Sequence, residues 1–81
     1  QNLLIAFNNT KKEIKVTKKS EVSINNIEVF NLIGQKVKSW SKFNKNLKEL
    51  TFSLNNISNA VYIIKVNTSL GKVSKKVIVT N

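Results

Sequence analysis

The sequence contains no cysteine, no histidine, no proline and no aspartate. Without cysteine there is neither a disulfide nor a thiolate metal site. Without histidine, the commonest general base and the commonest metal ligand are both missing. The lack of aspartate removes the acidic loops that calcium prefers. We therefore expect no metal and no cofactor, and a fold that depends on its apolar core.

Catalysis finds little support in the residues that remain. The only acids are four glutamates, and a glycosidase needs two carboxylates facing each other about 5–10 Å apart. Glu13, Glu28 and Glu49 lie at predicted strand positions that face solvent. Serines are frequent but have no histidine partner, and Ser74 and Lys75 point to opposite faces of a strand. The sequence predicts that this chain is not an enzyme.

Positive charge is abundant and comes entirely from lysine. Fourteen lysines against four glutamates give a net charge of +10 and an isoelectric point near 10.2. Proteins that read nucleic-acid sequence favour arginine for its bidentate geometry, whereas lysine gives diffuse attraction or protects edge strands. Phe7, Phe52 and Tyr62 fall on predicted core faces, so few aromatic side chains are free to stack on bases. Nucleic acid is therefore not an expected partner of this basic protein.

The length of 81 residues is enough for one small domain. Its longest apolar run, Leu3–Phe7, is far shorter than the roughly 20 residues of a membrane-spanning helix, so we expect no membrane insertion. The chain begins at Gln1 rather than methionine. We expect residues 1–81 to be a single domain excised from a longer protein, with its natural end at Asn81.

Alternation of apolar and polar residues predicts an all-β fold. In 49–54, for example, Leu50, Phe52 and Leu54 alternate with polar residues. Seven short runs separated by turn residues predict a small antiparallel β-sandwich with an immunoglobulin-like arrangement. The predicted strands are Leu3–Phe7, Glu13–Thr17, Ile27–Asn31, Gln35–Trp40, Glu49–Leu54, Ala60–Asn67 and Lys72–Val79.

Two local features refine this prediction. The run 61–64 is apolar on both faces, which is typical of a central strand covered on both sides. Gly34 follows Leu32 and Ile33 in a tight turn and can adopt a positive φ without strain. Trp40 has two interpretations, as a core tryptophan or as a cap on the end of the fourth strand, and we prefer the second.

Three segments, in order along the chain, carry a resemblance to a known family. Residues 27–37 read IEVFNLIGQKV, a strand, turn and strand; residues 57–66 read ISNAVYIIKV; and residues 71–79 read GKVSKKVIV. In this order, at a chain terminus, they resemble the type A C-terminal sorting domain of the type IX secretion system of Bacteroidetes-type bacteria. Two features depart from that pattern. Ala60 replaces a usual glycine, and the Tyr-Pro-Asn-Pro-like segment near the start is absent.

The resemblance implies a secretion signal that directs a cargo protein across the outer membrane. The cargo is expected to be covalently linked on the N-terminal side of the domain and to pass through the periplasm. There the outer-membrane translocon recognises the domain. A sortase-like peptidase at the cell surface then usually removes it, and the cargo is attached to the surface or released outside the cell.

In this family the signal is concentrated in the last strands. Carried over to this chain, the resemblance implies a recognition set with two supporting positions in the earlier turn. A partner could read the last strand by strand addition and by charge complementarity. Each of these residues also has a plain structural explanation, as core, turn or edge protection. The set is Gly34, Gln35, Tyr62, Lys65, Gly71, Lys75, Lys76 and Val77.

A different function class remains open from the sequence alone. The chain could be a carbohydrate-binding or spacer β-sandwich module appended to a secreted enzyme. Glycan binding predicts exposed, coplanar aromatic side chains, for which Trp40 and Phe43 are the candidates, whereas a spacer predicts no binding at all. An open edge strand also allows self-association of the domain.

Overall fold

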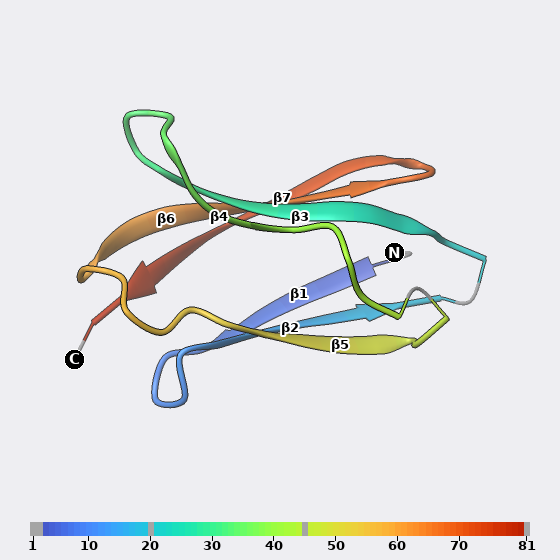
Figure 1. Cartoon of the computed structure of the whole chain (residues 1–81), viewed down its shortest axis with the longest axis horizontal. Coiled ribbons are helices and arrows are strands. Elements are labelled where there is room, and N and C mark those ends of the chain that lie inside the picture. The colour runs from blue at the N-terminus through green and yellow to red at the C-terminus, as the bar shows by residue number, and fades with distance from the viewer. Residues whose placement is uncertain (1–2, 20, 45, 81) are drawn as a thin grey trace.

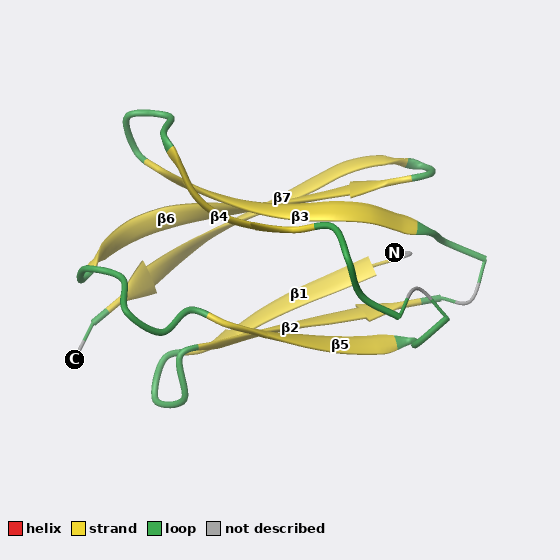
Figure 2. Cartoon of the chain, in the orientation of Figure 1, coloured by secondary structure: helices red, strands yellow, loops and turns green. Residues whose placement is uncertain are grey.

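The computed structural model describes residues 3–19, 21–44 and 46–80, which form seven β-strands and no helix (Figure 2). This confirms the all-β prediction. Within the described ranges there is accordingly no helix long and apolar enough to cross a membrane. The strands are β1 (Leu3–Asn8), β2 (Glu13–Lys18), β3 (Ile24–Asn31), β4 (Lys36–Trp40), β5 (Glu49–Ser53), β6 (Ala60–Thr68) and β7 (Gly71–Val79).

The strands form two antiparallel sheets that stack face to face as a sandwich (Figure 1). One sheet has the order β1-β2-β5 and the other has the order β4-β3-β6-β7. β6 therefore lies between β3 and β7, which confirms the predicted central position. The predicted cover on both sides is wrong, because no layer of the described residues packs on the outer face of β6, where Val61 and Ile63 are half-buried. The edge strands β1 and β7 contact each other along one side of the sandwich. On the other side, β4 and β5 approach through their aromatic residues.

The core lies between the sheets, where every second residue of each strand points inward. β-branched and leucine side chains dominate this layer, and each one that is fully buried stabilises the fold by about 1.5–3 kcal/mol. Its fully buried members are Ile14, Val16, Val22, Ile24, Ile27, Val29, Leu54, Ile64, Val66 and Val79.

Each predicted strand differs from the observed one at one boundary, by three residues in β3 and by one residue elsewhere; three of these differences have a structural reason. β3 begins at Ile24 rather than Ile27, because Ile24 pairs with Thr68 across an irregularity in the register. Gln35 lies in the turn, not in β4, because its side chain and backbone bond to the preceding strand. Lys18 belongs to β2, beyond the predicted end of that strand. It occupies an inward position at the end of β2 and is only 7% exposed.

Trp40 is the last residue of β4 and is partly buried against the core. Its ring centroid lies 5.0 Å from that of Phe52 at an interplanar angle of 40°. Phe43 meets the same Phe52 ring edge-on at 5.6 Å. Trp40 thus caps its strand, as preferred from the sequence, and also covers the β4/β5 side of the core. The two candidate aromatics surround Phe52 and do not form a flat exposed platform.

Replacing Ile64 tests the dependence on this core. Ile64 is fully buried on β6, and Ile64→Ala should lower the free energy of unfolding by about 2–5 kcal/mol through lost burial and a residual cavity. Urea unfolding followed by Trp40 fluorescence measures the loss. The matched control is Ile78→Ala, at an exposed position of β7, which should change stability by no more than about 0.5 kcal/mol. Equal effects of the two changes would contradict the assigned core.

Candidate functional site

The residues singled out from the sequence occupy three different environments. Two lie in the core, three lie in or next to turns at opposite ends of the four-stranded sheet, and three are lysines on β6 and β7 (Figure 1). They do not form one compact cluster. Which of them a partner can reach therefore depends on the face that each side chain occupies.

Tyr62 and Val77 are neighbours across the β6–β7 pairing, and both are buried. The Tyr62 hydroxyl donates a 2.7 Å hydrogen bond to the carbonyl oxygen of Ser58. This bond ties the connection between β5 and β6 to the central strand. The two side chains support the final hairpin from inside the sandwich.

The β3–β4 turn is fixed by Asn31, a residue that the sequence reasoning did not single out. Its Oδ1 accepts hydrogen bonds from the backbone N–H groups of Ile33 at 3.2 Å and Gln35 at 2.9 Å. Its Nδ2 donates to Gln35 Oε1 at 2.8 Å. Gly34 has φ +89° and open space around it. The signal for this role was an Asn four residues before Gln, with glycine between them.

Because its polar groups are used internally, the same turn presents its apolar side chains to solvent. Leu32 and Ile33 are 66% and 80% exposed. The β6–β7 turn lies at the opposite end of the sheet, where Gly71 has φ +121°. There Leu70 is exposed, and the Thr68 hydroxyl donates to the Gly71 carbonyl oxygen at 2.7 Å. Both glycines shape turns, and only the first turn adjoins the outer-face groove described next.

The outer face of the four-stranded sheet carries a mixed apolar and basic row. Lys36, Phe30, Ile63 and Lys76 are successive cross-strand partners on β4, β3, β6 and β7. Lys65 Nζ lies 5.1 Å from the centroid of the Phe30 ring, a cation–π contact worth about 0.5–1 kcal/mol where it is exposed. Phe30 and Ile63 are half-buried, and they line a shallow groove with Lys65 and the β3–β4 turn. We call Lys36, Phe30, Ile63, Lys65 and Lys76 the outer-face row.

Glu28 is the acid beside this row. Its Oε1 accepts a 3.0 Å hydrogen bond from Asn67 Nδ2, and its Oε2 lies 3.4 Å from Lys36 Nζ. The Asn67 hydrogen bond, followed by the Lys36 and Lys65 cations, outweighs desolvation and holds the pKa of Glu28 below its ordinary value of 4.5. Glu28 therefore offsets part of the positive charge of Lys36. Lys65 and Lys76 form no ion pair with a carboxylate among the described residues.

Lys75 and Lys76 are adjacent but face opposite ways. Lys76 pairs with Ile63 on the outer face, whereas Lys75 pairs with the buried Ile64 on the inner face. Both are exposed because β7 is an edge strand. The fold therefore assigns these two adjacent lysines to different surfaces.

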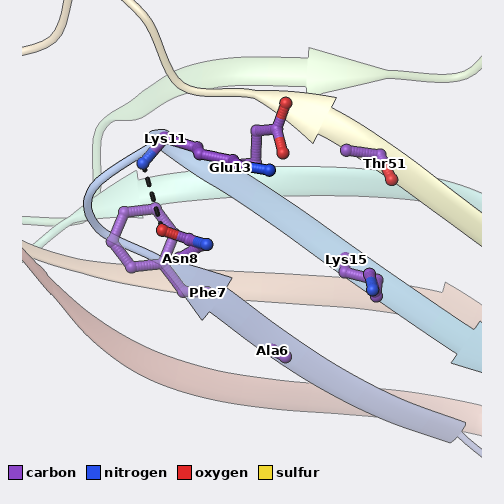
Figure 3. A pocket seen from close by; sticks show the side chains of 7 residues that line it. All are labelled: Ala6, Phe7, Asn8, Lys11, Glu13, Lys15 and Thr51. Carbon is purple, nitrogen blue, oxygen red and sulfur yellow. Dashed lines mark hydrogen bonds between the residues drawn. The ribbon is translucent and has the colours of Figure 1, made fainter.

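A separate hollow lies on the outer face of the three-stranded sheet (Figure 3). It brings Lys11, Glu13 and Lys15 near Thr51, and the backbone N–H of Lys11 donates to Asn8 Oδ1 at 3.1 Å. Charges of both signs line it without converging on a common point. Among the described residues, no group of acids is close enough to hold a metal ion.

The three glutamates on strands, Glu13, Glu28 and Glu49, also lie apart from one another. On adjacent strands, Glu13 pairs with Ser53 and Glu49 pairs with Thr17, four residues along each strand. That spacing is about 13 Å, which is too far for the two carboxylates to act together on one bond. Glu28 lies on the other sheet. This geometry gives no support to a glycosidase-like pair.

Comparison with models of known protein families matches residues 7–80 to a family described as "Secretion system C-terminal sorting domain". The match includes the outer-face row and both turns of the four-stranded sheet. It begins at Phe7, so most of β1 precedes it. No curated protein matches this chain.

The turn at Gly34 gives a direct test of local backbone strain. Gly34→Ala places a β-carbon at φ +89° with no neighbouring atom within 4 Å, so its cost comes from the backbone alone. We expect a loss of about 1 kcal/mol in unfolding free energy. Gly34→Asn should lose less, because asparagine tolerates positive φ better. Urea denaturation measures both, and an alanine variant as stable as the parent chain would contradict the assigned turn.

The lowered pKa of Glu28 predicts a pH-dependent contribution to stability. A carboxyl with a lower pKa in the folded chain stabilises the fold above its ordinary value of 4.5, and this contribution is lost as the pH falls through the folded value. Glu28→Gln should therefore show a smaller loss of stability than the parent chain between about pH 6 and pH 3.

Urea midpoints measured across that pH range test this expectation. Asn67→Ala removes the main cause of the pKa shift, so it should also flatten the profile. The profile of the double variant of Glu28→Gln and Asn67→Ala should be no flatter than that of Glu28→Gln alone. Parallel profiles for Glu28→Gln and the parent chain would show that this carboxyl does not carry the effect.

Proposed function

The chain belongs to the family of type IX secretion C-terminal sorting domains, and we propose that the secretion machinery reads it through the outer-face row of its four-stranded sheet. Family membership gives the coarse function, a C-terminal sorting signal for type IX secretion. Such a signal implies export across the outer membrane to the cell surface or the extracellular space. The residues that are read, the partners and the fate of the cargo are proposals.

The observation that carries this proposal is the arrangement of Phe30 and Ile63 between lysines. A half-buried apolar centre with a polar rim is the usual anatomy of a protein-docking surface. Lys65 and Lys76 have no carboxylate partner among the ion pairs of the described residues. A partner surface with carboxylates around an apolar site would fit this row and be steered towards it.

Five of the other predicted residues support this surface without belonging to it. Gly34 and Gln35 shape the turn beside the groove, and Gly71 shapes the turn that joins β6 to β7. Tyr62 and Val77 hold these two strands together from the core side. We propose that they preserve the register that aligns Lys65 and Lys76, without touching the partner.

We further propose the course of export that the family suggests. The domain, residues 1–81, follows a cargo to which it is covalently linked, and both pass through the periplasm. An outer-membrane translocon binds the domain, and a sortase-like peptidase at the cell surface removes it. The cargo is then attached to the surface or released. The domain contributes recognition and no catalysis to these steps.

Charge-removing substitutions on the outer face test the proposed surface. The domain is fused to a periplasmic reporter in a host with type IX secretion, and reporter outside the cell is measured. Lys65→Gln with Lys76→Gln should reduce the extracellular fraction about tenfold, because one such charge pair is worth up to about 1 kcal/mol and two act together. Point changes suit this test better than deletion of 72–81, which also removes core residues.

The matched control changes the same number of charges elsewhere. Lys42→Gln with Lys48→Gln alters exposed lysines outside the strands and should leave export unchanged. Urea midpoints of all variants show whether each domain still folds. Equal export by the two double variants would rule out the outer-face row as the recognition surface.

A further inference from the structure

The two sides of the sandwich are closed differently. On the β4/β5 side, the rings of Trp40, Phe43 and Phe52 fill the space between the sheets. On the β1/β7 side, the edge strands β1 and β7 contact each other. No aromatic side chain fills that side among the described ring contacts, and the inner face of β7 is only partly covered, because Val73 is half-buried and Lys75 is exposed.

A groove follows this side of the sandwich. It consists of two adjoining hollows that share Leu3 and Val73, with volumes of about 200 and 230 Å³. Leu3 and Val22 are buried beneath it, and Val73 is half-buried. Apolar side chains therefore line a channel that runs along the β1 edge. We call it the β1/β7 groove.

Lys72 and Lys75 give this groove its charge, and of the two it is Lys75 that lies on the inner face of β7. Lys75 alternates with Val73 and Val77 on that face and pairs with Ile64. A lysine at an inward position is unexpected, because the other inward residues near it are apolar. No carboxylate is among the residues that line the groove, and neither ion pair of the described residues includes Lys75.

The edges of β1 and β7 differ in how they are protected. β7 carries Lys72, Lys75 and Lys76, and edge lysines, especially inward ones, discourage an added strand. β1 reads LLIAFN, with no charge, no proline and no glycine. Leu4 is 62% exposed on its outer face. β1 therefore has the features of an edge open to strand pairing, with unpaired backbone groups along its free side.

We propose that the free edge of β1 binds an extended segment of a partner protein as a fourth strand of that sheet. The segment would place apolar side chains at alternate positions over Leu3 and Val73, and a carboxylate among them facing Lys75. The sequence alone led us to expect the added strand on the last strand, and we propose β1 in its place. In this arrangement β7 provides the charge and β1 provides the hydrogen-bonding edge.

The occupant is a partner protein and not a second copy of this chain, because the β1 strand of a second copy would bring no carboxylate to Lys75. A second copy pairing through β1 would bring leucine, isoleucine and phenylalanine but no carboxylate. Most of β1 also lies before the residues matched by the family model. The inference concerns a second surface and does not depend on the proposed reading of the outer-face row.

The test uses the purified domain and two synthetic peptides of about nine residues, each alternating valine and threonine, with either Glu or Lys at the central inward position. NMR titration measures affinity, and amide hydrogen exchange identifies the strand that becomes protected. The Glu peptide should bind about fivefold tighter than the Lys peptide at low salt. The amides of β1, and not those of β7, should gain protection.

Two adjacent lysines provide matched variants. Lys75→Glu should reverse the peptide preference, whereas Lys76→Glu, with the same change in net charge on the opposite face, should keep it. Equal effects of the two variants, protection confined to β7, or no binding at millimolar peptide would each overturn the proposal. So would a β1-paired dimer of the domain alone that excludes the peptide. The peptide-binding experiment does not depend on secretion. Its outcome can therefore contradict the β1 proposal while the export experiment supports the outer-face row, and the reverse.

Discussion

The apolar layer between the two sheets is the interaction on which the rest of the structure depends. The chain has no disulfide and no structural metal ligand of the sulfur or imidazole type, and a chain of this size buries only about 60–65% of its unfolded surface. Ile and Val side chains on the inner faces of the strands, such as Ile14 and Ile64, are fully buried. Strand propensity and burial therefore favour the same conformation at the same residues.

This use of the inner faces leaves the outer faces and the edges for recognition. Residues that look alike in sequence then have different roles. Lys75 and Lys76 are adjacent, yet one faces the β1/β7 groove and the other the outer-face row. Glu28 adds a further distinction, because it compensates Lys36 while Lys65 lies over the Phe30 ring. The net charge alone does not show which lysines lie together. The pairing of the strands determines which of them share a surface.

The sequence was sufficient to predict where the strands are. It was not sufficient to predict which residues lie beside one another on neighbouring strands and in the turns. Alternation predicted all seven strands because burial imposes a period of two. Gln35 was placed in β4 because it directly follows Gly34 of the predicted turn, but its hydrogen bonds with Asn31 hold it in the turn. Lys18 was assigned to a connection because lysine is rarely buried. The outer-face row was missed because Phe30 and Ile63 are 33 residues apart, and their pairing depends on register.

Strand addition was assigned to β7 from the sequence without knowledge of the sheet order. From sequence alone, a final strand is expected to be an edge, and its lysines look like a charged rim for a partner. The sheet order shows that β1 is also an edge and lies beside β7. Lysines that attract an acidic partner also weaken strand pairing on their own strand. Charge on β7 and backbone hydrogen bonding on β1 are therefore compatible within one groove, whereas both functions on β7 would oppose each other.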